Sequence, residues 1–487
     1  MKKILIIGNS PLPDENTRSR PAAGLRTHQF SSPLLKKGGT VISDAKRAFS
    51  AEKRQNFSIR TVNIAMPECY DQNPGRKEII HSDKYSQFVI PKNDPGLIRI
   101  IQDIHDKFHP DAIIGVNTYP SYIASQIKSR SPLWADLNGW VMAEAQAQAY
   151  KIDSNDYISH YYKMEKSILK RADKISAVSE TQRFSVIGEL AFCGRLNKES
   201  FGYKFVHHIP NGTQWFEGEN NIKDELKVGS ETETNAREIL KKIPENAFVL
   251  LWLGGYNTWV DEYTLFKSVE DAVKECKNLY FVSTGGEIKG LDNKTFTKFM
   301  NMIDKSKFKD RFIFLGWVDT EVIPYIYKRA DCGLNVDRIC TETLTGARNR
   351  INEMMKFGLP VITTLGSEIS YEVPRIGAGI GIPSGKHEKL SEAIVAIYKE
   401  WRGGRELASV EFKKYGENGQ KYIEEKCNYE YLMKPLMEWL ENPRPAPDRG
   451  VSVRFGRISS IRGGVKYIKD KGLLNFIKKL LQKFRRG

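Results

Sequence analysis

The chain alternates short apolar, β-branched runs with segments of helical periodicity, and it does so in two separate halves. KKILIIG (2–8) and FSIRTVNIA (57–65) open the first alternation, and FVLLWLGG (248–255) and LYFVSTGG (279–286) open the second. Runs that are apolar on both faces are typical of parallel strands covered by helices. We therefore predict an α/β protein with two Rossmann-like, doubly wound domains, for which 487 residues suffice.

Polar and proline-rich stretches indicate where these domains begin and end. A linker, 214–245, is rich in Glu, Asn and Lys and separates a first domain, 1–213, from a second, 246–410. Helical patterns over 411–445 are expected to pack back across both domains, and ENPRPAPDRG leads into a tail, 446–487. Because such domains bind ligands at the carboxyl ends of their strands, we predict a site in the cleft between them.

Most of the net charge of +16 resides in the tail, since residues 449–487 hold twelve Lys and Arg but one Asp. Leu473, Ile477, Leu480 and Phe484 recur there every three or four residues, with lysines between them. This pattern predicts a basic amphipathic helix that lies on an anionic membrane surface. A helix that packs on a partner or mediates oligomerisation is the alternative. Without interleaved aromatic platforms, we expect no nucleic acid as a partner.

Several absences in the sequence narrow the function classes. The six cysteines include no CxxC pair and the eight histidines form no metal-spaced cluster, so we expect free thiols, no metal and no cofactor. The N-terminal apolar run of about five residues is too short for a signal peptide. No apolar run reaches the roughly 18 residues of a membrane span. We expect a cytoplasmic protein, peripheral on the inner face of the membrane.

Four glycines stand where predicted strands end or a helix begins. Gly24 lies at the start of the helix after the first strand, Gly254 and Gly255 follow one strand of the second half, and Gly286 follows the next. Such positions let a phosphate approach the backbone; turns that need positive φ are the alternative. Neither a GxGxxG fingerprint nor a Walker lysine is present, which disfavours a dinucleotide-linked dehydrogenase.

The stretch TETLTGARNRINEMMKFGLPVITT concentrates charge at the start of a predicted helix. Arg348 and Arg350 follow Gly346 in its first turns, although the positive end of the helix dipole disfavours cations there. This indicates a bound anion. Glu353, about one and a half turns further, is placed to accept hydrogen bonds from ribose hydroxyls. An exposed Arg–Glu helix face is the alternative interpretation.

The order of these motifs resembles the glycosyltransferases of family 4, which have the two-domain GT-B architecture. ADKISAVSE and HHIPNG resemble the end of their first domain, and FLGWV, RADCGLNVD, GARNRINEMMKFGLPVITT and GAGIGIPSG resemble their second, over most of residues 1–440. The resemblance implies retaining transfer from a nucleotide-activated sugar without a metal. It also implies that Glu353 contacts the donor ribose and that the loop near Gly24 closes over the donor.

Two departures from the family pattern change the residue assignments. The family carries two glutamates eight positions apart, but Thr345 stands eight before Glu353. The family's Arg and Lys for the donor diphosphate are replaced by GGYNTWVDE, which offers Asn257. We therefore assign phosphate neutralisation to Arg348 and Arg350. The remaining donor contacts are assigned to Gly24, Gly254, Gly255, Asn257, Gly286, Thr345 and Gly346.

The acceptor side is predicted to use WADLNGW, at the end of a strand in the first domain. Asp136 is placed to orient or deprotonate an acceptor hydroxyl, and Asn138 and Arg26 to bind the acceptor. An Asx turn before a helix is the alternative for Asp136. Asp136, Arg348 and Glu353 are the predicted catalytic residues.

These inferences predict a glycosyltransferase that moves a sugar from a nucleotide-sugar donor to a glycan or lipid-linked acceptor in cell-surface polysaccharide synthesis. A nucleotide-sugar 2-epimerase of the same fold is one alternative, although it would have no need of a basic membrane tail. A catalytically weak, glycosyltransferase-like scaffold is the other, and the missing second glutamate supports it.

Overall fold

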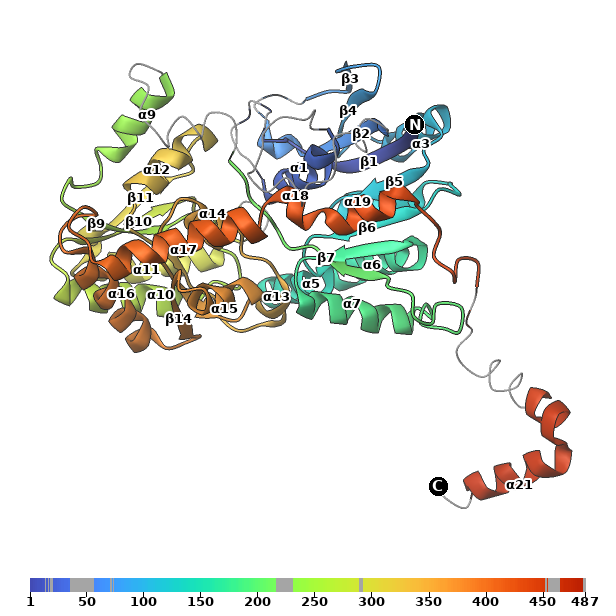
Figure 1. The fold of residues 1–487 in the computed structure, drawn as a ribbon. Helices are drawn as coiled ribbons and strands as arrows, with labels where there is room; N and C mark the ends of the chain where they lie inside the picture. The colour runs from blue at the N-terminus through green and yellow to red at the C-terminus, as the bar shows by residue number, and fades with distance from the viewer. Residues whose placement is uncertain are drawn as a thin grey trace.

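Two α/β domains stand side by side in the computed structural model, bridged by helices near the C-terminus (Figure 1). The structure describes residues 1–13, 15, 17, 21–35, 57–70, 72, 74–215, 231–288, 292–451, 453 and 465–484. Parts of the predicted linker (216–230) and of the predicted tail (452, 454–464 and 485–487) lie outside the described residues.

The first domain is built on an eight-stranded sheet of order β3-β4-β2-β1-β5-β6-β7-β8, parallel except for β3. Its strands are β1 (Lys2–Ser10), β2 (Phe57–Ala65), β3 (Lys77–Ile80), β4 (Tyr85–Pro91), β5 (Ala112–Gly115), β6 (Leu133–Leu137), β7 (Lys174–Ala177) and β8 (Val206–His208). Its helices are α1 (Ala22–Leu35), α3 (Leu97–Phe108), α4 (Thr118–Gln126), α5 (Val141–Ile152), α6 (Ile158–Arg171) and α7 (Glu180–Phe192).

The second domain has a six-stranded parallel sheet of order β11-β10-β9-β12-β13-β14. Its strands are β9 (Phe248–Trp252), β10 (Leu279–Thr284), β11 (Phe312–Gly316), β12 (Cys332–Asn335), β13 (Val361–Leu365) and β14 (Gly379–Pro383). Its helices are α9 (Glu231–Leu240), α10 (Glu262–Glu275), α11 (Lys294–Asp304), α12 (Ile323–Arg329), α13 (Thr341–Thr345), α14 (Asn349–Lys356), α15 (Glu368–Arg375) and α16 (His387–Trp401).

The sequence of β1 explains why helices cover both faces of its sheet. Successive side chains of a strand point to opposite faces. Ile4 and Ile6 pack into the core that includes Phe30 of α1, whereas Leu5 and Ile7 pack into the core on the opposite face. All four residues from Ile4 to Ile7 have no exposed surface, so this strand cannot lie at an edge or against solvent.

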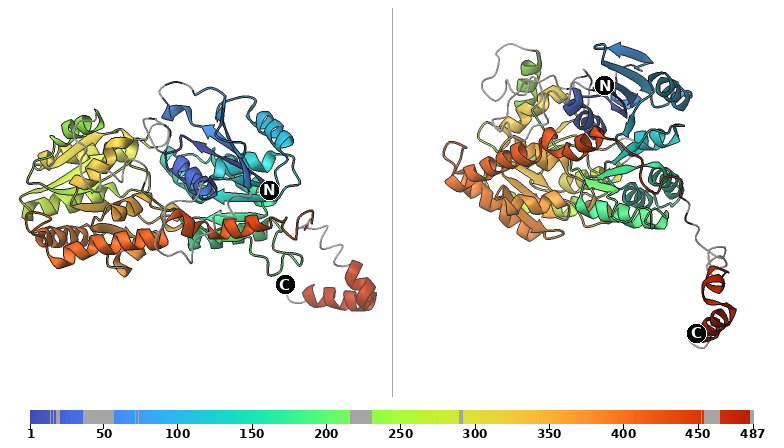
Figure 2. Two further views of the ribbon diagram at one scale, coloured as in Figure 1. Left: turned by 45° about the horizontal axis from the view of Figure 1, so that its top comes forward. Right: turned by 45° about the vertical axis from the view of Figure 1, so that its right-hand side comes forward.

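Three helices connect the domains along one side of the molecule (Figures 1 and 2). α17 (Val410–Lys426) packs against α14 and α16 of the second domain, and α18 (Tyr429–Leu432) contacts α1 of the first. α19 (Lys434–Glu441) buries Leu436 and Leu440 in the core of the first domain. The hinge between the domains lies against this connection, because Thr213 N–H donates to the carbonyl of Cys427 at 3.0 Å.

Beyond these helices the chain leaves the body and forms α21 (Leu473–Phe484), seen at the lower right of Figure 1. Leu473, Leu474 and Ile477 are between 45% and 75% exposed there, so this apolar face is uncovered in the structure. Within the part of the chain that the structure describes, no helix is both long enough and apolar enough to span a bilayer.

Candidate functional site

The carboxyl ends of the first sheet face the second domain. Ser179, two residues after β7, donates its hydroxyl to the carbonyl of Thr345 at 2.7 Å. Asn211, three residues after β8, donates its amide to Oδ1 of Asn349 at 2.7 Å. These contacts place α13 and α14 opposite the first domain, and the region between the domains is therefore the candidate ligand site.

Two glycine loops meet at the carboxyl ends of β9 and β10. Gly254 and Gly285 have positive φ angles of 103° and 79°, and a Cβ atom on Gly285 would lie 2.5 Å from the carbonyl oxygen of Gly254. Tyr256 N–H donates to the carbonyl of Gly286 at 3.1 Å, which ties the loops together. The adjoining Gly255 approaches Ile288 so closely that a Cβ atom would clash at 2.4 Å. The positive-φ interpretation thus holds for Gly254, which is half-buried.

Arg350 lies beside these loops and has no ion-pair partner among the described residues. Its guanidinium stacks over the ring of Trp252 at 4.0 Å, and Nη2 donates to the carbonyl of Gly255 at 3.2 Å. Nη1 is buried and has no hydrogen-bond partner in the structure, and burial lowers the pKa of the group. A half-buried cation without an ion pair among the described residues, and with one buried N–H group that lacks an acceptor, is suited to an anionic ligand.

Arg348 has the opposite environment, although it stands only two residues earlier. Its Nε lies 2.5 Å from Oδ2 of Asp337, and its Nη2 lies 2.7 Å from Oε2 of Glu342. Arg348 is buried, and these two carboxylates raise its pKa above the ordinary value of an arginine. Two protein carboxylates thus already pair with Arg348, and its predicted roles in phosphate neutralisation and catalysis stay predictions. Gly346 serves this cluster, since a Cβ atom would lie 2.5 Å from Oε1 of Glu342.

Three further residues that the sequence predicts to contact the donor belong to the second domain. Glu353 is 26% exposed, accepts a hydrogen bond from Thr213 Oγ1 and pairs with Lys356 at 2.7 Å. Thr345 is buried, and its hydroxyl donates to the carbonyl of Thr341 at 2.8 Å. Asn257 is half-buried, two residues after Gly255.

Asp136 and Arg26 form a buried ion pair beneath the cleft edge. Arg26 Nη2 lies 2.7 Å from Asp136 Oδ1, and Nε lies 3.0 Å from Oδ2. Arg26 also donates to the carbonyls of Ile209 and Pro210, while Ser176 donates to the carboxylate. Both side chains are buried, and the predicted roles of Asp136 in catalysis and of Arg26 in acceptor binding stay predictions.

Two further predicted residues of the first domain differ in placement. Gly24 is inside α1, where a Cβ atom would lie 1.9 Å from the carbonyl oxygen of Pro11, so its lack of a side chain serves helix packing. Several residues of the loop that precedes it lie outside the described residues. Asn138 is half-buried at the end of β6 and donates to Oδ1 of Asn117 at 3.0 Å.

Sequence reasoning missed Glu144, in the first turn of α5. α5 packs against α13 of the second domain, and Glu144 interacts with Glu342 and Arg348 across the domain boundary. Burial and the charge of Glu342 raise the pKa of Glu144 to about 7. The sequence carries no signal for this, because Glu144 stands in an ordinary helical pattern and its neighbours come from the other domain.

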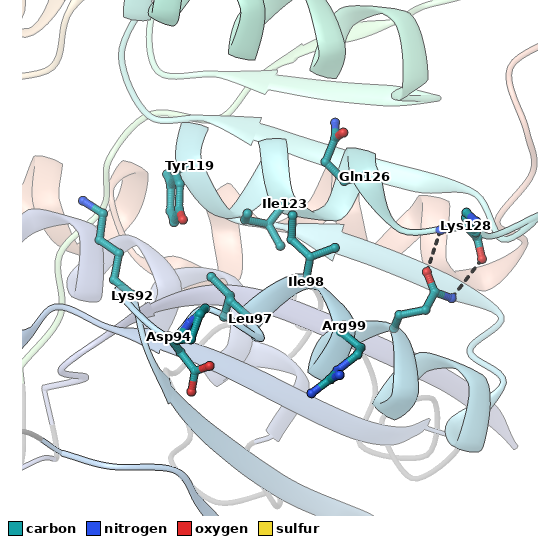
Figure 3. A pocket seen from close by; sticks show the side chains of 11 residues that line it. Lys92, Asp94, Leu97, Ile98, Arg99, Tyr119, Ile123, Gln126 and Lys128 are labelled. Atoms are coloured by element: carbon teal, nitrogen blue, oxygen red, sulfur yellow. Dashed lines mark hydrogen bonds between the residues drawn. The ribbon is translucent and has the colours of Figure 1, made fainter.

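A separate groove of about 570 Å³ runs between α3 and α4 (Figure 3). Lys92 and Tyr119 lie at one end and Lys128 at the other, where Gln102 bonds the backbone of Lys128. Every lining residue belongs to the first domain, so the groove is distinct from the Arg350 region. Among the residues that the structure describes, no group of three or more His, Cys, Asp and Glu side chains could hold a metal.

Comparisons with known proteins agree with this architecture. Residues 247–400 match the family model for glycosyl transferases group 1. Sucrose-phosphate synthase of Thermosynechococcus elongatus is similar in structure with a TM-score of 0.60 at 15% identity, covering 91% of this chain and 98% of that one. HepE of Anabaena, solved with UDP and glucose, has a TM-score of 0.57 at 15% identity over 91% of this chain and 100% of that chain.

WaaG, a glycosyltransferase involved in lipopolysaccharide biosynthesis, has a TM-score of 0.55 at 11% identity, covering 91% of this chain and 100% of its own. No curated protein matches the chain by sequence. The chain thus has the GT-B fold and carries a glycosyltransferase domain, which confirms the predicted fold class and enzyme class.

We expect Asp136→Asn and Arg26→Met each to lower the free energy of unfolding by about 3–5 kcal/mol, because each leaves a buried partner unpaired. Chemical denaturation measures this, with Asp304→Asn, at an exposed position, as the control. The double variant should lose less free energy of unfolding than the two single variants lose in sum, since both single changes remove the same ion pair. Single variants as stable as the native chain would contradict the structural role.

Glu144→Gln should become more stable than the native chain as pH rises. The pKa of Glu144 is about 7 in the folded state, whereas its ordinary value is 4.5. Between pH 4.5 and 7 the folded state therefore keeps a proton on Glu144 that the unfolded state has lost. Native stability therefore falls as pH rises through this window and levels off above it. Melting temperatures from pH 5 to 8 test this, with Glu275→Gln, an exposed position, as the control. A variant-to-native difference that is constant with pH would contradict it.

Proposed function

We propose that the protein transfers a glycosyl group from a nucleotide-sugar donor to a glycan or lipid-linked acceptor in the synthesis of a cell-surface polysaccharide. The observation that carries this proposal is Arg350, a half-buried cation with no ion pair among the described residues, beside a glycine loop in a glycosyltransferase group 1 domain. HepE, which shares the fold, was solved in complex with UDP-glucose.

We place the donor diphosphate between the Gly254–Gly255 backbone and Arg350. Nη2 of Arg350 lies 3.9 Å from the point where a Cβ atom of Gly254 would stand, so a ligand on this glycine contacts the guanidinium. Glu353 supplies the ribose contact. Its two oxygens each have one protein partner, and a carboxylate offers about four acceptor sites, so capacity remains for hydroxyl groups.

In the proposed reaction the bond between the anomeric carbon and the diphosphate oxygen breaks as a bond to the acceptor oxygen forms. Negative charge grows on the leaving diphosphate, where a fixed cation stabilises it most. Because Asp136 is held in its ion pair, we assign the acceptor's proton to the leaving diphosphate rather than to that carboxylate. Retention of configuration rests on the family resemblance, and NMR of the product's anomeric proton tests it.

Arg350→Gln should weaken the binding of a nucleoside diphosphate by about 10- to 100-fold, because charge-assisted hydrogen bonds to the phosphates are lost. A panel of nucleotide sugars, scored by thermal shift and by release of nucleoside diphosphate, identifies the donor. The matched control is Arg402→Gln, on the exposed end of α16. Glu353→Ala should also weaken donor binding.

The same screen separates the alternatives. Donor binding without diphosphate release, even with lipid extract present, would favour the scaffold. Conversion of the donor into an isomer would favour the epimerase. Equal affinity in the native chain and in Arg350→Gln would contradict the proposed donor site.

We also propose that the tail holds the enzyme at the inner face of the cytoplasmic membrane. A hollow of about 520 Å³ lies where the tail leaves the body. It contains five basic and two acidic side chains, Arg130, Lys170, Arg171, Arg195, Arg449, Asp173 and Asp448. Arg195 pairs with Asp448, and Arg171 and Arg449 share Asp173. Arg130 and Lys170 are left exposed, and their charge adds to that of the tail.

The described part of α21 supports the same proposal. Leu473, Leu474 and Ile477 form an exposed apolar strip, and Lys478 is exposed beside it. Insertion of the apolar strip and attraction of the lysines to anionic lipid act together.

A variant with four lysines of the tail changed to Glu should bind vesicles that contain phosphatidylglycerol about 100-fold more weakly, or weaker still, since each lysine contributes roughly 1 kcal/mol. The four are Lys466, Lys469, Lys471 and Lys478. Co-sedimentation measures this, and native binding should weaken with salt. The control changes four exposed lysines of the second domain, Lys305, Lys309, Lys386 and Lys389, to Glu. Equal loss in both variants would contradict a specific role of the tail.

A further inference from the structure

Three asparagine side chains form a continuous chain of hydrogen bonds along the cleft edge of the first domain. Asn9 lies near the end of β1, Asn117 follows β5 and Asn138 follows β6, and these strands are neighbours in the sheet. Asn117 Nδ2 donates to Asn9 Oδ1 at 3.1 Å, and Asn138 Nδ2 donates to Asn117 Oδ1 at 3.0 Å. We call Asn9, Asn117 and Asn138 the amide chain.

The middle residue has a backbone conformation that is rare for any residue except glycine. Asn117 has φ 73° and ψ 161°, a region that costs a side-chain-bearing residue about 1–3 kcal/mol. Its N–H points to Asp136 Oδ2 at 3.4 Å, and its carbonyl accepts from Ser121 N–H at 3.0 Å. The buried Arg26–Asp136 pair thus helps to hold the strained turn. Strain of this kind persists where it positions a functional group.

One backbone carbonyl fixes the direction of every amide in the chain. Asn117 Nδ2 also donates to the carbonyl of Ala23 at 2.9 Å, and a carbonyl can only accept. Nδ2 of Asn117 must therefore face Ala23, and its Oδ1 must face Asn138. Asn138 is then obliged to turn its NH₂ group toward Asn117, which leaves Asn138 Oδ1 without a partner among the described residues.

This polarity determines what the end of the amide chain can bind. Asn138 is half-buried at the edge that faces the second domain, so its free oxygen is accessible from the cleft. An amide oxygen is an acceptor, and its ligand must donate. Sugar hydroxyls donate, whereas a fully ionised phosphate does not.

We propose that Asn138 Oδ1 accepts a hydrogen bond from a ring hydroxyl of a sugar bound in the cleft, and that Asn117 and Asn9 are positioning residues that hold the oxygen in place. This inference rests on the proposed function. The hydroxyl belongs either to the donor sugar or to the acceptor sugar, and two binding measurements distinguish these sources.

The first experiment measures sugar recognition with Asn138→Ala. UDP, UDP-glucose, and glucose in the presence of saturating UDP are titrated by calorimetry. UDP should bind the variant and the native chain equally. We expect a loss of about 3- to 10-fold, the worth of one neutral hydrogen bond. If Asn138 contacts the donor sugar, the variant loses affinity for UDP-glucose. If it contacts the acceptor sugar, the variant loses affinity for glucose in the presence of UDP.

Derivatives of UDP-glucose and of glucose, each lacking one ring hydroxyl, identify the hydroxyl that Asn138 contacts. The derivative without the contacted hydroxyl should bind the native chain more weakly, and Asn138→Ala should not weaken it further. Asn257→Ala, in the second domain, serves as the comparison, because its effect should not depend on the same hydroxyl.

The second experiment tests the positioning role with Asn117→Gly and Asn117→Ala. Both variants remove the amide, but only glycine adopts the backbone conformation of Asn117 without strain. The glycine variant should therefore unfold at a higher temperature than the alanine variant. Both should lose sugar affinity to the same extent as Asn138→Ala, while UDP affinity stays unchanged.

Two results would overturn the proposal. One is equal sugar affinity in the native chain and Asn138→Ala for both probes. The other is full sugar affinity in Asn117→Gly, which would show that the strained amide positions nothing. A native chain that binds no UDP, and whose behaviour Arg350→Gln leaves unchanged, would instead contradict the proposed donor site, so the two failures are distinguishable.

Discussion

The buried ion pair between Arg26 and Asp136 holds together the parts of the first domain that form the cleft edge. It joins α1 to β6, and through the carbonyls of Ile209 and Pro210 it also joins them to the segment that leads into the second domain. Asp136 further contacts the N–H of Asn117. A buried pair of this kind adds little net stability compared with apolar residues, but it specifies one geometry, because any displacement leaves charges unpaired.

The second domain also contains a buried arginine that is paired with carboxylates, on the other side of the cleft. Arg348 bridges Asp337 and Glu342 and thereby fixes the segment between β12 and α14. These two carboxylates pair with Arg348. Arg350, near the glycine loops, has no ion pair among the described residues. Arg348 thus has a structural role, whereas Arg350 is the arginine that the proposed function assigns to the donor.

The sequence was sufficient for the strands whose burial is complete, and insufficient where contacts come from distant segments. The apolar runs Ile4–Ile7 in β1 and Phe248–Trp252 in β9 have no exposed surface, and the sequence pattern predicted both strands. β3 was missed, because it is a four-residue edge strand with three exposed side chains and carries no apolar run. The environments of Arg348 and Arg350 could not be separated, since the sequence pattern places both in the first turns of one helix. In the structure α14 begins at Asn349, and Arg348 precedes it with non-helical backbone angles and contacts Asp337.

The placement of the basic hollow bears on which acceptor suits the proposed function. Arg130 precedes β6 and Arg171 precedes β7, so the hollow lies at the amino edge of the first sheet. The cleft lies at the carboxyl edge of the same parallel strands, as the contact between Ser179 and Thr345 shows. A membrane held against the hollow would therefore face away from the cleft. This arrangement favours an acceptor whose reactive sugar extends well beyond the lipid headgroups, as the end of a growing glycan does, over one whose reactive hydroxyl lies at the bilayer surface.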